Sequence, residues 1–81
     1  CSWHYHKLKD ETFHVHQGKL QVSHSKGDNI DFSDRIILSC GDSFYVPVGL
    51  RHQMLALEDT YMYEFSTEHF DEDSYRIIKG D

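Results

Sequence analysis

The chain has 81 residues, with 8 basic and 14 acidic side chains and a net charge of −6 at pH 7. A chain this short forms one domain, whose folding buries only about 60% of the surface exposed when unfolded. The acidic balance argues against a nucleic-acid partner, and no apolar run is long enough for a transmembrane helix. Seven histidines stand out, and because imidazole is the commonest metal ligand, they point to a metal site.

Two cysteines, Cys1 and Cys40, lie far apart in the chain. A disulfide framework needs more cysteines than two, so we expect reduced thiols and a cytoplasmic location. The chain begins without methionine and directly before histidine-rich sequence. We therefore expect a further segment to precede Cys1.

Short runs of alternating polar and apolar side chains in the first half of the chain indicate β-strands. We predict strands at residues 2–8 and 12–17 and around Leu20 and Val22, with Gly18 at the turn of a hairpin between the last two. A second turn is expected at residues 26–29, before a strand centred on residues 36–38.

The second half continues in the same way. Residues 43–46 form a strand after a glycine turn, and the segment from Pro47 to Gly49 ends it. Two more strands are expected at residues 52–57 and 60–66, followed by a polar tail over residues 67–81. No segment before residue 66 has the periodicity of a long helix. The pattern predicts an all-β sandwich or barrel.

A cluster of metal-ligating side chains begins near the N-terminus. His4 and His6 are two residues apart on a predicted strand and therefore point to the same face. Glu11 opens the next strand, and His52 follows a rigid corner at Pro47. Two or three imidazoles with one carboxylate suit zinc, iron, manganese, nickel or cobalt and leave coordination positions open for water or substrate.

Two ordered motifs resemble those of the cupin superfamily. The first, H-x-H-x4-E-x6-G, spans residues 4–18, and the second, G-x5-P-x-G-x2-H, spans residues 41–52. Cupins are small antiparallel β-barrels of jelly-roll type, so the resemblance implies one such domain over residues 1–81. It also implies one divalent transition metal bound by His4, His6, Glu11 and His52.

A narrower resemblance concerns the segment from Trp3 to Phe13, which is similar to cupins of sugar and sugar-phosphate metabolism. Mannose-6-phosphate and lyxose isomerases are examples, and similar single-domain cupins are linked to surface-polysaccharide synthesis. Lys9, two residues before Glu11, is shared with the lyxose isomerase type. The resemblance implies an isomerase or epimerase of a small carbohydrate or sugar phosphate, with Glu11 and Lys9 as catalytic residues.

Substrate contacts are expected from residues near the second motif. Arg51, beside His52, has the fork geometry for a carboxylate or phosphate. Tyr45, Met54 and Tyr63 are expected to line the barrel and contact the substrate.

The remaining histidines are expected outside the metal site. His14 and His16 form a second H-x-H pair, but they alternate with Phe13 and Val15, which share the face of Glu11. They should therefore point outward. His24, at a strand end, and His69, in the tail, are expected to be solvated.

Two other functions fit the same ligands. A three-histidine, one-glutamate site also occurs in cupin dioxygenases, and metal-dependent lyase chemistry on a small organic substrate is related to it. The third alternative is a non-catalytic sugar-binding module with a structural metal. In each case we expect a homodimer, because a small β-domain with a marginal core gains from association.

Overall fold

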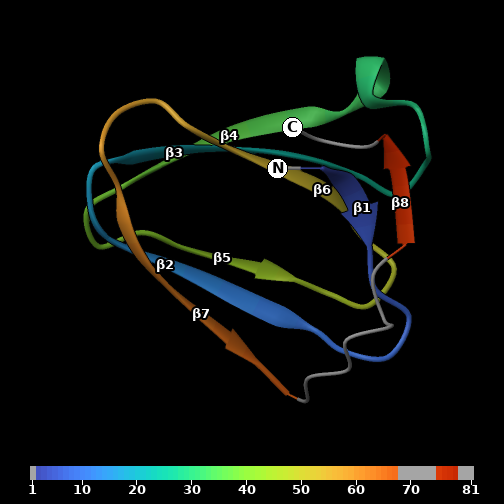
Figure 1. Cartoon of the computed structure of the whole chain (residues 1–81), viewed down its shortest axis with the longest axis horizontal. Helices are drawn as coiled ribbons and strands as arrows, with labels where there is room; N and C mark the ends of the chain where they lie inside the picture. Colours follow the sequence, from blue (N-terminus) through green and yellow to red (C-terminus); the bar gives the residue numbers. More distant parts are fainter. Residues whose placement is uncertain (1, 68–74, 79–81) are drawn as a thin grey trace.

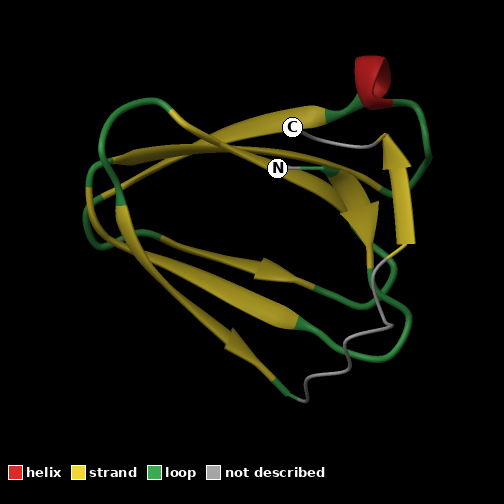
Figure 2. Cartoon of the chain, in the orientation of Figure 1, coloured by secondary structure: helices red, strands yellow, loops and turns green. Residues whose placement is uncertain are grey.

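The computed structural model of the chain describes residues 2–67 and 75–78. These residues form two antiparallel sheets, of order β4–β3–β6–β1–β8 and β5–β2–β7 (Figures 1 and 2). The strands are β1 (Trp3–Tyr5), β2 (Glu11–Gln17), β3 (Lys19–Ser25), β4 (Asp34–Ser39), β5 (Ser43–Val46), β6 (Arg51–Ala56), β7 (Tyr61–Ser66) and β8 (Tyr75–Ile78). A 3-10 turn, η1 (Ile30–Phe32), lies between β3 and β4. The all-β prediction is confirmed.

The closed barrel implied by the cupin resemblance is replaced by two facing sheets. Within the described residues, β4, β8, β5 and β7 are sheet edges. Hydrogen bonds hold the crossing segments at the corners. Gly41 N, between β4 and β5, donates to Val15 O on β2 at 2.8 Å, and Thr60 Oγ1, just before β7, donates to Lys19 O on β3 at 3.0 Å. The molecule is therefore a two-layer sandwich with hydrogen-bonded corners.

The predicted hairpin at Gly18 is wrong. β2 pairs with β5 and β7, whereas β3 pairs with β4 and β6, so the chain crosses from one sheet to the other at this glycine. The connections from β4 to β5 and from β6 to β7 also cross between sheets, at the same end of the molecule (Figure 1). Alternation identifies the two faces of a strand but not its partner, which is why the hairpin was predicted.

The hydrophobic core lies between the sheets. β2 contributes Phe13 and Val15, and because side chains alternate along a strand, Glu11 faces the same interior. The other buried core residues come from β3, β4 and β5: Leu20, Val22, Leu38 and Val46. Glu11, the first residue of β2, lies at the end of that strand away from the corner at Gly18 and directly opposite the core residue Val46.

A further strand, β8, lies within the segment expected as a polar tail. It pairs antiparallel with β1, with Tyr5 opposite Tyr75, and the two rings stack with their centroids 5.2 Å apart. β8 therefore covers an edge of β1, the strand that carries His4. The described part of the chain has no helix with the length and hydropathy needed to cross a bilayer.

Candidate metal centre

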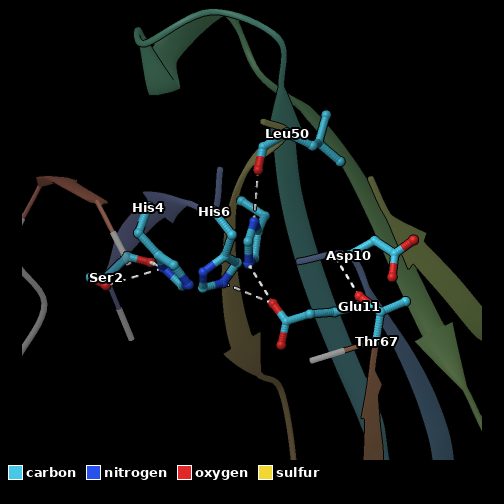
Figure 3. Close-up of polar contacts among 8 residues, drawn as sticks. Ser2, His4, His6, Asp10, Glu11, Leu50 and Thr67 are labelled. Carbon is cyan, nitrogen blue, oxygen red and sulfur yellow. Dashed lines mark hydrogen bonds and ion pairs between the residues drawn. The ribbon is translucent and has the colours of Figure 1, made fainter. Parts of the chain in front are cut away.

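Three histidines converge on the interior face of the five-stranded sheet. His4 on β1 lies directly opposite His52 on β6, and His6 follows β1 by one residue. One ring nitrogen of each lies within 4.8 Å of those of the other two. Figure 3 shows His4 and His6 turned toward Glu11. The cluster is buried at His6 and His52 and half-buried at His4.

Backbone carbonyls orient two of the three imidazoles. His52 Nδ1 lies 2.9 Å from Leu50 O, and His4 Nδ1 lies 2.9 Å from Ser2 O. A carbonyl oxygen only accepts hydrogen bonds, so in each neutral ring the proton is assigned to Nδ1. This tautomer leaves the lone pair on Nε2. Such an outer hydrogen bond is typical of histidines that bind metals.

Glu11 stands beside the three rings. Its Oε1 lies 2.9 Å from His6 Nε2 and 3.7 Å from His52 Nε2 (Figure 3). Since β2 belongs to the other sheet, the carboxylate reaches the histidines across the interior. The sandwich thus brings all four predicted ligands to one place.

His52 provides a direct test of whether these residues fit a metal. Its Nε2 is buried and has no hydrogen-bond partner among the described residues. The pKa of His52 is lowered to about 4, mainly by burial. The hydrogen bond with Leu50 raises this pKa, whereas the charges on His4, His6 and Lys9 lower it further. His52 is therefore neutral at pH 7, with an unsatisfied lone pair, and an unsatisfied buried acceptor is costly. A divalent transition metal satisfies it, so the residues fit the cofactor.

Lys9 also lies at the cluster. Its side chain is buried, and its charge lowers the pKa of both His52 and Glu64. A buried ammonium needs nearby negative charge, and Glu64, whose pKa Lys9 lowers, lies close enough to interact with it.

Arg51 does not reach the cluster. It precedes His52 on β6 and therefore points to the opposite face of the sheet. Its Nε donates to Asp28 Oδ1 and its Nη1 to Gly49 O, both at 2.8 Å, and its guanidinium lies 3.8 Å above the Tyr5 ring. These contacts connect β6, β1 and the β3–β4 connection.

The expectation that Tyr45 and Tyr63 line the interior is wrong. Both are exposed on the outer face of the three-stranded sheet, because their neighbours Val46 and Met62 take the inner positions. The Tyr45 hydroxyl donates to Asp10 Oδ2 at 2.6 Å, and this hydrogen bond raises the pKa of Tyr45. Met54, the remaining predicted contact, packs against the core.

The second H-x-H pair points outward, as predicted. His14 Nδ1 lies 2.7 Å from Ser43 Oγ, and His16 is exposed, with its ring centroid 6.1 Å from that of Tyr63. His69 lies outside the described residues.

Two interior residues were missed. His24 was expected to be solvated, but it is half-buried on β3, directly opposite His52, with its ring centroid 5.0 Å from that of Phe44. Glu64 on β7 lies opposite Phe13, on the interior side of the three-stranded sheet. Because His24 is two residues after the buried Val22, alternation along the strand could have predicted that it faces the interior. The interior position of Glu64 follows only from the pairing of β7 with β2.

The chain belongs to the cupin family, because the family model described as cupin domain matches residues 1–66. Cupin domains commonly bind a metal, which agrees with the histidine cluster. A comparison with curated proteins finds no match.

Among solved structures, the chain is similar to CapF, a capsular polysaccharide assembling protein of Staphylococcus aureus. Two crystal structures of that protein match with TM-scores of 0.79 and 0.80 at 26% and 27% identity, over 94% and 98% of this chain. A CapF structure with the inhibitor 3-isopropenyl-tropolone matches with a TM-score of 0.79 at 25% identity. This chain spans about a quarter of the length of the CapF chains.

Proposed function

We propose that the protein is a metal-dependent isomerase or epimerase of a small carbohydrate or sugar phosphate in polysaccharide metabolism. The main observation is the buried His52 Nε2, which has no described hydrogen-bond partner and lies beside His4, His6 and Glu11. The similarity to CapF supports the link to polysaccharides.

The chemistry follows from the donor set. His4, His6, His52 and Glu11 would hold the metal, which when bound supplies Lewis acidity toward a hydroxy-carbonyl group. The positive charge of Lys9 stabilises negative charge that develops on substrate oxygens during enolisation. The Phe13 ring, with its centroid 5.9 Å from that of His52, excludes water from the inner side of the cluster.

The apolar side chains near the histidines favour a second candidate function, that of a dioxygenase or lyase for a small organic substrate. Phe13 and Met54 provide apolar surface beside the histidines. Elemental analysis of protein purified without added metal discriminates, because a redox-inert zinc site argues against oxygen chemistry. The third candidate, a non-catalytic sugar-binding module, predicts sugar binding that persists without the metal.

The isomerase proposal is tested by proton exchange. Metal-loaded protein is incubated in D2O with a panel of aldoses and phosphorylated aldoses, and NMR follows deuterium uptake at C2. We expect exchange with at least one sugar, and its loss together with the metal in His6→Ala. The matched control is His14→Ala, which removes an outward histidine and should retain both. Absence of exchange across the panel contradicts the proposal, and sugar binding by metal-free His6→Ala supports the non-catalytic module.

The CapF inhibitor offers a probe of the site itself. A tropolone has adjacent hydroxyl and carbonyl oxygens, the same pair as a hydroxy-carbonyl sugar. We expect 3-isopropenyl-tropolone to bind the metal-loaded protein and not His6→Ala, as measured by calorimetry. We also propose a cytoplasmic setting, in which the exposed, free thiol of Cys40 stays reduced.

A further inference from the structure

Glu64 is placed beside the metal centre by the register of the three-stranded sheet. β2 pairs with β7 so that Glu11 lies opposite Ser66 and Phe13 lies opposite Glu64. Glu64 is therefore the diagonal neighbour of Glu11 on the interior face. Diagonal neighbours in an antiparallel pair are about 7–8 Å apart, within reach of long side chains.

The surroundings of Glu64 agree with this position. The pKa of Glu64 is raised, mainly by partial burial and further by the negative charge of Glu11. The charges of Lys9 and His6 act in the opposite direction and lower it. The Glu64 carboxyl therefore interacts electrostatically with Glu11, Lys9 and His6, although its side chain remains accessible to solvent. Ion pairs among the described residues involve Glu11 and Asp28 but not Glu64.

The other acid–base candidates are less suited to accept a proton from carbon. Glu11 is buried and its Oε1 lies 2.9 Å from His6, so this carboxylate is committed to the ligand set. Lys9 is a cation, and an ammonium has no lone pair until it is deprotonated. An accessible carboxylate facing the same interior has the free lone pair that the reaction requires.

We propose that Glu64 is the acid–base residue of this site and transfers the proton between carbons of a hydroxy-carbonyl substrate. This inference rests on the proposed function. Glu64 carboxylate takes the proton from the carbon next to the carbonyl, the electrons of the C–H bond form a carbon–carbon double bond, and the carbonyl π electrons move to oxygen. The proton of the adjacent hydroxyl then passes to the former carbonyl oxygen. The former carbonyl carbon takes the proton back from the Glu64 carboxyl while the carbonyl re-forms at the neighbouring carbon, which completes a 1,2-isomerisation.

The test compares Glu64→Gln with Glu58→Gln, a control at an exposed turn outside the site. In the deuterium-exchange assay, Glu64→Gln should lose at least about 100-fold in rate, the usual contribution of a general base. Metal content and tropolone affinity should stay within about twofold, because Glu64 is not a ligand. Glu58→Gln should match the wild type in all three measurements.

A second readout does not depend on turnover. With 13C-labelled glutamate, the NMR signal that disappears in Glu64→Gln identifies the Glu64 carboxyl. We expect this signal to shift when tropolone binds to the metal-loaded protein.

The outcomes separate the two proposals. Wild-type protein without exchange contradicts the proposed function, whereas exchange that survives in Glu64→Gln contradicts only the role of Glu64. Loss of metal in Glu64→Gln overturns the assignment in favour of a ligand. A Glu64 signal that does not respond to tropolone overturns its placement beside a bound substrate, whether or not the protein turns over sugars.

Discussion

His52 lies where the core meets the candidate metal site. Its ring packs near Phe13, and its Nδ1 is fixed by Leu50 O while its Nε2 faces Glu11. The same burial that removes water from the ring keeps it neutral. A histidine in this state is both a ligand ready for a metal and a source of acid sensitivity.

The lowered pKa of His52 predicts that the folded protein loses stability as the pH falls. The pKa of His52 is about 4 in the folded protein and 6.5 in a model peptide. Because the unfolded state binds the proton more readily, the metal-free protein should be fully stabilised above pH 6.5 and lose stability as the pH falls toward 4. At about 1.4 kcal/mol per pKa unit, the loss is on the order of 3 kcal/mol. Urea unfolding at several pH values measures it.

The control for this prediction is a comparison of two histidines. His52→Gln should flatten the stability profile between pH 6.5 and 4, whereas His14→Gln, on the outer face, should leave it unchanged. A profile that stays equally steep in His52→Gln assigns the acid sensitivity to other groups.

Among the elements, the corners between sheets decide the fold. At the corner from β2 to β3, Gly18 has φ +99° and lies against the corner from β6 to β7. A Cβ at Gly18 would be 2.8 Å from Thr60 Cα and would also overlap Asp59 O. Gly41, at the corner from β4 to β5, has φ +90° but open space around it. Substitution of Gly41 therefore tests the cost of backbone strain alone, whereas substitution of Gly18 tests backbone strain together with close packing.

We expect Gly41→Ala to cost about 1–2 kcal/mol, the usual price of a left-handed conformation for an L-residue. Gly18→Ala should cost on the order of 3 kcal/mol or more, because backbone atoms of the facing corner must also shift. Thermal or urea unfolding of the two variants measures both values. Equal losses would show that the approach of the two corners does not constrain the fold.

On the scale of the whole molecule, each sheet has one face in the core and one face outside. The outer face of the three-stranded sheet carries four exposed aromatic side chains: Tyr45, Tyr61, Tyr63 and Phe65. The rings of Tyr63 and Phe65 lie 6.3 Å apart between centroids. A face this apolar is typical of interaction surfaces.

We propose that the protein is a homodimer that pairs these aromatic faces. Light scattering at micromolar concentration should give twice the monomer mass, and a Tyr63→Ser/Phe65→Ser variant should shift toward the monomer. The control is Ile37→Ser/Leu55→Ser, which changes two exposed residues on the outer face of the other sheet. A monomeric wild type contradicts the dimer, and dissociation only in the control moves the interface to the five-stranded sheet.

The candidate metal centre could be predicted from the sequence because its signal is local. The spacing of His4 and His6 places both on one face of a strand, and alternation from Glu11 through Phe13 to Val15 assigns the carboxylate to the core side. The outward direction of His14 follows from the same period. The cupin motifs then added His52, which is distant in sequence but held at a recognisable corner.

Other features depended on contacts that no local pattern contains. Tyr45 alternates with Phe44 and Val46, so both faces of β5 looked equally suited to the core. On β7, Tyr63 belongs to the more apolar of the two faces, and yet this face lies outside. Arg51 stands beside a ligand in sequence, yet the pleat turns it to the opposite face.

The sequence by itself thus determined an all-β cupin domain and the four side chains of the candidate metal site. Only the tertiary structure decided that Gly18 is a corner between two sheets, that β8 covers β1, and that Glu64 faces the site. The physical reason is that a period of two specifies the faces of a strand from neighbouring residues. Which strands pair, and in which register, depends on contacts between residues far apart in the chain.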